Sequence, residues 1–107
     1  MSKIPIKIRV NGKQKTIGII IDGYLAVFKR RKSQHYFRKF KGWAISTSAL
    51  FQLKSLHIPY IIIYELESQD KFRVKTSIMD TKGTILTSKY TKGDEQIVLA
   101  QSEFEKL

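Results

Sequence analysis

Apolar and polar residues alternate at the start of the chain in the way that half-buried strands require. From position 4 to position 10 every second residue is apolar, and proline or basic residues stand between them, so the two sets lie on opposite faces of a strand. Asn11-Gly12 is a strong hairpin signal. Thr16 to Ile21 is rich in β-branched residues, and the turn signal Asp22-Gly23 separates it from the apolar run Tyr24 to Phe28. We therefore predict a three-stranded antiparallel meander.

The middle strand of this meander, Ile17 to Ile21, differs from its neighbours because it is apolar on both faces. Strands of this composition are usually covered on both sides, so we predict a central, doubly covered position. Gly18 interrupts the apolar run and indicates a β-bulge or a close approach of another group to the backbone.

One principal helix and several strands are predicted in the remainder of the chain. Apolar residues at positions 49, 50 and 53 recur at helical spacing, and Ser46 or Thr47 suits the N-cap of a helix that ends near Leu56-His57, before Pro59. Further strands are predicted at Tyr60 to Glu65, Phe72 to Thr76, Thr84 to Thr87 and Gln96 to Ala100, although the last segment is also compatible with the start of a helix. The predicted fold class is α+β with a mainly antiparallel sheet.

Composition supports a single globular domain spanning residues 1–107. The chain is 42% hydrophobic, which is enough to build one core, and it contains no repeat and no linker rich in proline, glycine or serine. The absence of cysteine excludes disulfides and thiolate metal sites. No apolar run has the length of a secretory signal or a membrane span. We expect a soluble, cytoplasmic protein without a membrane partner.

Charge is distributed very unevenly along the chain, whose formal net charge is +11. Residues 1–54 contain thirteen Lys or Arg and a single acid, Asp22, whereas residues 55–107 contain seven basic and eight acidic residues. Like charges at this density oppose compaction unless a partner neutralises them. The amino-terminal half therefore indicates a polyanionic partner.

The densest basic segment also carries aromatic residues. Between positions 29 and 41 there is no acid, and the basic residues are Lys29, Arg30, Arg31, Lys32, Arg38, Lys39 and Lys41. If a helix begins at Ser33, Tyr36, Phe37, Phe40 and Trp43 fall on one face, and we favour a core position for Phe37 and Phe40. If the segment is a loop, rings remain free for stacking. Tyr36 and Trp43 are candidates for stacking or for packing beneath the contact surface.

These features predict binding of DNA or RNA without catalysis and without a cofactor. Basic side chains release counterions from phosphates, and aromatic rings stack on unpaired bases. The predicted contact residues are Lys29, Arg30, Arg31, Lys32, Tyr36, Arg38, Lys39, Lys41 and Trp43. An acidic protein partner, which the protein would bind or inhibit through its basic face, is an alternative. A homodimer formed through an edge strand near Thr84 is also compatible with the sequence.

Catalytic signals are weak. Glu65 and Glu67 lie two apart at a predicted strand end, with Asp70 and Asp80 after them, and such carboxylates are able to hold Mg²⁺. A solvated strand end with its turn is the simpler interpretation, and we favour it. His35 lies among the basic residues, where a general base would be useful, although a further phosphate contact is the simpler interpretation.

The order of a meander, a helix and a strand over residues 14–66 resembles the core of restriction-endonuclease-like nucleases. In that family an acid ends the second strand and an Asp/Glu-x-Lys triplet lies on the third. Asp22 and Lys29 match two of these positions, but the triplet here is Val27-Phe28-Lys29 and lacks its carboxylate. The resemblance implies either an inactive copy or an Mg²⁺-dependent nuclease that uses Asp22 with Glu65 or Glu67.

Overall fold

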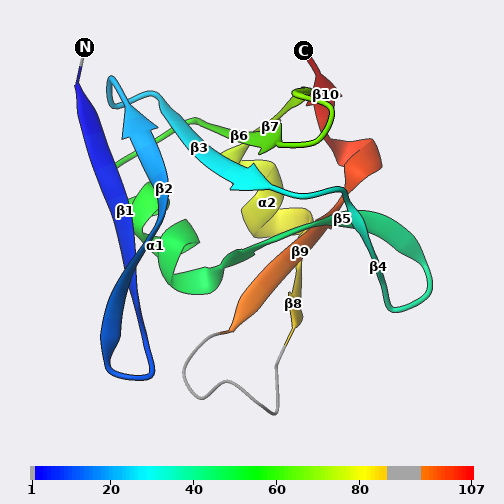
Figure 1. Ribbon diagram of the computed structural model, residues 1–107, viewed down its shortest axis with the longest axis horizontal. Helices are drawn as coiled ribbons and strands as arrows, with labels where there is room; N and C mark the ends of the chain where they lie inside the picture. Colours follow the sequence, from blue (N-terminus) through cyan, green and yellow to red (C-terminus); the bar gives the residue numbers. More distant parts are fainter. Residues whose placement is uncertain (1, 87–94) are drawn as a thin grey trace.

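The computed structural model describes residues 2–86 and 95–107, which form ten strands and two α-helices in two sheets (Figure 1). The larger sheet has six strands in the order β1-β2-β3-β6-β7-β10. These strands are Lys3–Val10, Lys13–Ile21, Leu25–Arg30, Tyr60–Glu65, Lys71–Lys75 and Glu105–Lys106, respectively. The strands β1, β2 and β3 pair antiparallel, which confirms the predicted meander.

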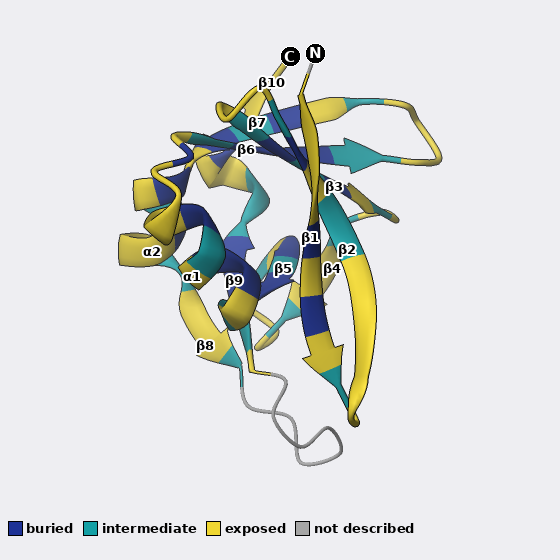
Figure 2. Cartoon of the chain, turned by 90° about the vertical axis from the view of Figure 1, so that its left-hand side faces the viewer, coloured by how far each residue is buried: buried dark blue, intermediate teal, exposed yellow. Residues whose placement is uncertain are grey.

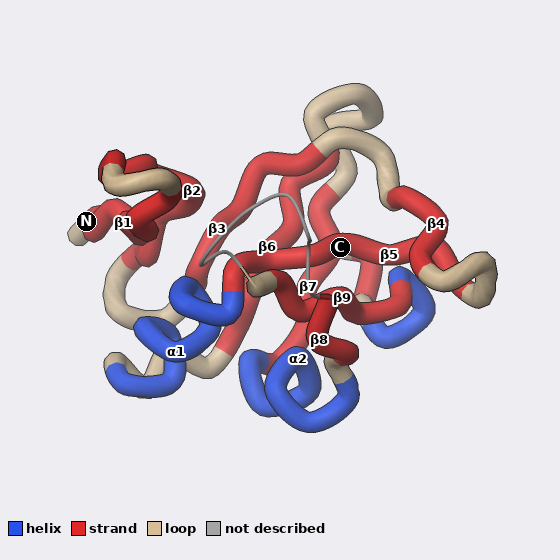
Figure 3. Tube along the Cα trace, turned by 90° about the horizontal axis from the view of Figure 1, so that it is seen from below, coloured by secondary structure: helices blue, strands red, loops and turns tan. Residues whose placement is uncertain are grey.

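The smaller sheet has four strands in the order β4-β5-β9-β8. These strands are Gln34–Tyr36, Phe40–Ser46, Gln96–Ala100 and Thr84–Leu86, respectively. The helices α1 (Thr47–Ser55) and α2 (Thr76–Lys82) lie side by side in Figure 3, and a 3₁₀ turn, Gln101–Glu103, precedes β10. The predicted α+β class, the principal helix and the predicted strands are confirmed. Thr87, the last residue predicted for the β8 strand, lies outside the described residues.

One parallel pairing joins the meander to the rest of the larger sheet. The strand β3 runs beside β6, with Leu25 next to Tyr60 and Arg30 next to Glu65. The chain between these two strands contains β4, β5 and α1. Residues 31–41 of the basic segment therefore lie in this crossover, and the two ends of the crossover are anchored in the larger sheet.

A single cluster of buried side chains draws on both sheets and both helices. Phe28 and Ile61 from the larger sheet are fully buried, as is Ile45 from the smaller one. Trp43 of β5 packs against Phe72, with 4.8 Å between the ring centroids. This shared core fixes the position of the smaller sheet relative to the end of β3.

Of the two predicted cap residues, Ser46 is the N-cap of the helix α1. The Oγ of Ser46, which is almost fully buried, accepts a hydrogen bond of 3.2 Å from the backbone N–H of Ser48. We expect Ser46→Ala to lower the free energy of unfolding by about 1 kcal/mol, since it leaves an orphan N–H at the start of the helix. Urea unfolding measures this change. Ser48→Ala is the control, because the Ser48 side chain is exposed and alanine favours helix; an equal loss in both variants would contradict the capping role.

The first hairpin projects beyond the sheet. The strand β2 pairs with β3 over Ile19–Ile21, and the register of β1 with β2 shifts between Ile6 and Lys7. We call residues 7–18, which extend past this pairing and are mostly exposed in Figure 2, the arm. A Cβ at Gly18 would lie 2.9 Å from the Phe28 ring, so the predicted close approach at this glycine is confirmed.

Two expectations about local structure were wrong. The segment after Ser33 is neither a helix nor a loop but the hairpin β4–β5, which reverses at Phe37 and Arg38, both with positive φ. Phe37 is therefore 48% exposed instead of buried, while Phe40 is half-buried. The strand β2 is not covered on both faces, because Ile19 is 39% exposed. Sequence analysis also missed the helix α2 and the short strand β10.

Candidate functional site

A large open cleft lies where the arm separates from β3. The cleft has a volume of about 1070 Å³, at the upper end of the range for ligand pockets. Its walls come from the arm, from the end of β3 and from β5. The basic side chains that line it are Lys3, Lys15, Lys29, Arg30, Arg31 and Lys32. We call this site the basic cleft.

Most of the charge of the basic cleft has no ion-pair partner among the described residues. Six cations line it, and no acid does. Of these six, Lys32 alone makes an ion pair with a described carboxylate, that of Glu67 at 3.7 Å, and both side chains are largely exposed. An exposed pair of this kind contributes little to stability and competes weakly with an incoming anion. The cleft therefore presents a concentrated positive potential to the solvent.

Arg30 is the most constrained of these cations. Its Nη1 donates to the backbone oxygen of Lys29 at 2.9 Å, its Nε donates to that of Ala44 at 3.4 Å, and its guanidinium carbon lies 5.4 Å from the Phe28 ring centroid. The side chain is half-buried and has no carboxylate partner among the described residues. Burial lowers the pKa of Arg30 from its usual value, against an opposing effect of nearby Tyr36. An oriented, poorly hydrated guanidinium of this kind is suited to bind phosphate.

Tyr36, at the end of β4, lines the cleft close to Arg30. Burial raises the pKa of its hydroxyl, and the charge of Arg30 acts in the opposite direction. Its ring is half-buried and lies 6.3 Å from the Phe40 ring, measured between centroids. Tyr36 therefore remains a candidate for stacking.

Trp43 is 3% exposed and packs against Phe72 and Phe104, so its ring offers no free face for stacking. Its Nε1 donates a hydrogen bond of 3.1 Å to the backbone oxygen of Arg31. Ser33 adds a hydrogen bond of 2.8 Å from its hydroxyl to the side chain of Gln101. These contacts anchor the backbone of the basic segment to the core while the side chains of Arg31 and Lys32 stay exposed.

The remaining predicted contact residues form a separate group. Arg38, Lys39 and Lys41 are exposed on the β4–β5 hairpin and do not line the basic cleft. His35 lies opposite Lys41 in the same hairpin and is also exposed. The structure thus divides the predicted basic segment into a part that lines the cleft and a part that extends away from it on the hairpin.

Sequence analysis did not assign Lys3 and Lys15 to the site. Both lie on the first hairpin and line the basic cleft, Lys15 in the arm and Lys3 at the start of β1, where it pairs with Ile21. The density of basic residues in the first fifteen positions was a signal for a charged surface. Nothing in the local pattern indicates that these lysines share a cleft with residues 29–32, since that depends on where β2 separates from β3.

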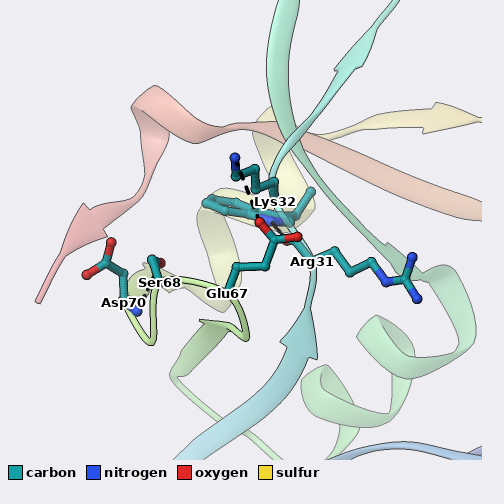
Figure 4. Close-up of polar contacts among 6 residues, drawn as sticks. Arg31, Lys32, Glu67, Ser68 and Asp70 are labelled. Carbon is teal, nitrogen blue, oxygen red and sulfur yellow. Dashed lines mark hydrogen bonds and ion pairs between the residues drawn. The ribbon is translucent and has the colours of Figure 1, made fainter.

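The structure does not bring the candidate catalytic carboxylates together. Asp22 precedes the start of β3 and accepts a hydrogen bond of 2.8 Å from the Ser2 N–H, whereas Glu65 lies beside Arg30 at the far end of the β3–β6 pair. Glu67 turns toward Lys32, and Asp70 points away from both, as Figure 4 shows. No group of three potential metal-ligating side chains occurs among residues 2–86 and 95–107. The pairing of Asp22 with Glu65 or Glu67 therefore loses its geometric basis.

Comparisons with protein-family models, with curated proteins and with solved structures found no match to this chain. Within the described parts of the chain, no helix is long and apolar enough to cross a membrane.

Proposed function

We propose that this protein binds nucleic acid through the basic cleft, as a binding module without catalysis of its own. The observation that carries the proposal is the lining of the cleft, which contains six basic side chains and no acid among the described residues. A nucleic acid carries regularly spaced phosphates, so one molecule is able to contact several of these cations at once. Residues 29–32 supply most of the contacts, and Lys15 supplies contacts from the arm.

The position of Arg30 supports this assignment over a general role in solubility. Cations that only keep a protein soluble are exposed and mobile, whereas Arg30 is half-buried and held by two backbone oxygens. Holding an unpaired charge in such a place costs stability. A bound phosphate would recover this cost through charge-assisted hydrogen bonds.

The salt dependence of binding tests the proposal. We expect the variant Arg31→Ala/Lys32→Ala to bind labelled DNA or RNA more weakly, by a similar factor for unrelated sequences. The slope of log K against log salt should fall by about 1.5, because two phosphate contacts are lost. Fluorescence anisotropy across a salt series gives both quantities, and a gel shows whether the probes stay intact.

The matched control is Lys54→Ala/Lys82→Ala. This variant removes the same charge from α1 and α2, where the two lysines pair with Asp80 and Glu103 and do not line the cleft. Equal loss of affinity in the two variants would indicate nonspecific attraction by net charge and would contradict the assigned site. Failure to bind either nucleic acid at low salt would reject the proposal in favour of an acidic protein partner.

A further inference from the structure

The walls of the basic cleft are chemically mixed. Besides its six cations, the cleft is lined by apolar side chains of the meander, among them Ile17, Ile19, Ile21 and Val27. Ile19 is 39% exposed, and the other three are half-buried. A ligand that offered only phosphates would leave this apolar surface in contact with water. The cleft therefore fits a ligand that presents charged and apolar groups next to each other.

The apolar side of the cleft lies where two strands of the meander separate. The strands β2 and β3 are hydrogen-bonded neighbours up to the pair Ile19 and Val27, and they separate beyond it (Figure 1). Both residues of this pair line the cleft. Because Lys29 and Arg30 follow Val27 on β3 and also line the cleft, the apolar wall adjoins the basic one.

The two forms of nucleic acid differ in what they offer to such a site. A duplex places its phosphates outside and stacks its bases inside, so its outer surface has no base faces to bury. A single strand exposes base faces beside its phosphates and binds grooves that combine cations with apolar or aromatic surface. Tyr36, which is half-buried at the basic side of the cleft, supplies an aromatic ring for such a groove.

We infer that the basic cleft takes single-stranded nucleic acid, with phosphates along residues 29–32 and at least one base against the apolar wall formed by Ile17, Ile19 and Val27. This inference rests on the proposed function and specifies its ligand. We expect binding to be independent of base sequence, because the apolar wall contacts ring faces, which every base has.

The test compares one strand in two states. A short labelled strand of mixed sequence, as DNA and as RNA, is titrated alone and after annealing to its complement, at the same salt concentration. We expect the single strand to bind about tenfold more tightly than the duplex. Inorganic polyphosphate at an equal phosphate concentration should compete poorly, because it carries charge without bases.

Ile19 provides a substitution pair that isolates the apolar wall. Threonine and valine have nearly the same shape and both suit a strand, but threonine places a hydroxyl where valine has a methyl group. We expect Ile19→Thr to weaken single-strand binding about fivefold relative to Ile19→Val, with an unchanged salt slope. Thermal unfolding monitored by circular dichroism verifies that both variants are folded, which the partial exposure of this residue favours.

The outcomes separate this inference from the proposed function. Tighter binding of duplex than of single strand, or equal competition by polyphosphate, would overturn the inference while leaving a phosphate-binding cleft. Equal affinities of the two Ile19 variants would also overturn it, since no base would then lie on this wall. Loss of all binding to both nucleic acids in the unaltered protein would reject the proposed function itself.

Discussion

Replacing Arg30 with methionine is expected to weaken nucleic-acid binding by about tenfold to hundredfold without lowering the stability of the fold. The loss follows from the removal of one charge-assisted phosphate contact. Stability is retained because methionine keeps the apolar stem against Phe28 and removes a desolvated charge that has no carboxylate partner among the described residues. Anisotropy measures the affinity, and urea unfolding measures the stability.

Arg73→Met is the matched control for this variant. Arg73 lies in β7, does not line the basic cleft, and has its own carboxylate partner, with 2.7 Å between its Nη2 and Glu105. Its substitution should leave the salt slope unchanged. If Arg30→Met instead unfolded the protein while Arg73→Met did not, Arg30 would be a structural residue and its assignment to phosphate binding would fail.

Gly42→Ala is expected to have the largest effect on folding, a loss of about 3 kcal/mol in the free energy of unfolding. Gly42 is buried where β5 pairs with β9, opposite Ala100, and a Cβ at this position would overlap the backbone carbonyl oxygen of Leu99. Backbone atoms move less easily than the end of a side chain, so the two strands would have to separate. Urea unfolding followed by the fluorescence of Trp43, the only tryptophan of the chain, reports on this region directly.

Gly12→Ala is the reference for this prediction. Gly12 has a φ of +77°, but a Cβ there would meet nothing within 4 Å. Its substitution should lower the free energy of unfolding by only about 1 kcal/mol, which is the cost of placing alanine in the left-handed conformation. A loss at Gly42 no larger than the loss at Gly12 would show that the contact between β5 and β9 is more tolerant than its geometry indicates.

Elements with strong local signals were predictable from the sequence. The turn at Asn11-Gly12 was marked by the two residue types that most readily adopt positive φ, and both adopt it. The strand Tyr60–Glu65 was equally clear, and the cap was narrowed to two residues, of which Ser46 is the one used. In each case the residues that decide the structure lie within a few positions of one another, so local pattern and tertiary structure agree.

The hairpin β4–β5 was missed because its signals are atypical. The strand β4 has three residues and no β-branched side chain, and its turn places Phe37 and Arg38 at φ values of 54° and 56°, which neither residue type indicates. Gly42 was the available clue, since a glycine within a strand often marks a close backbone contact. The helix α2 was missed because its seven residues are too few for a clear apolar period.

The candidate site was predictable in its charge but not in its shape. The density of basic residues at 29–32 indicated a phosphate-binding surface before any fold was known. The opposite wall, with Lys15 and Ile19, required knowledge of where β2 separates from β3. The sequence did not decide whether Trp43 stacks on a base or packs inside the protein, because an aromatic residue beside basic residues suits both roles. Its exposure of only 3% in the structure favours packing.

The parallel pairing of β3 with β6 has a consequence for a chain that is still being synthesised. Until β6 has been synthesised, the edge of β3 that will pair with it has no partner. An unpaired apolar strand edge tends to associate with other chains. The basic residues 29–32 complete β3 and continue directly from it, and charges that flank an apolar strand act as gatekeepers against aggregation. The same four side chains would thus protect the nascent chain by mutual repulsion before the cleft exists.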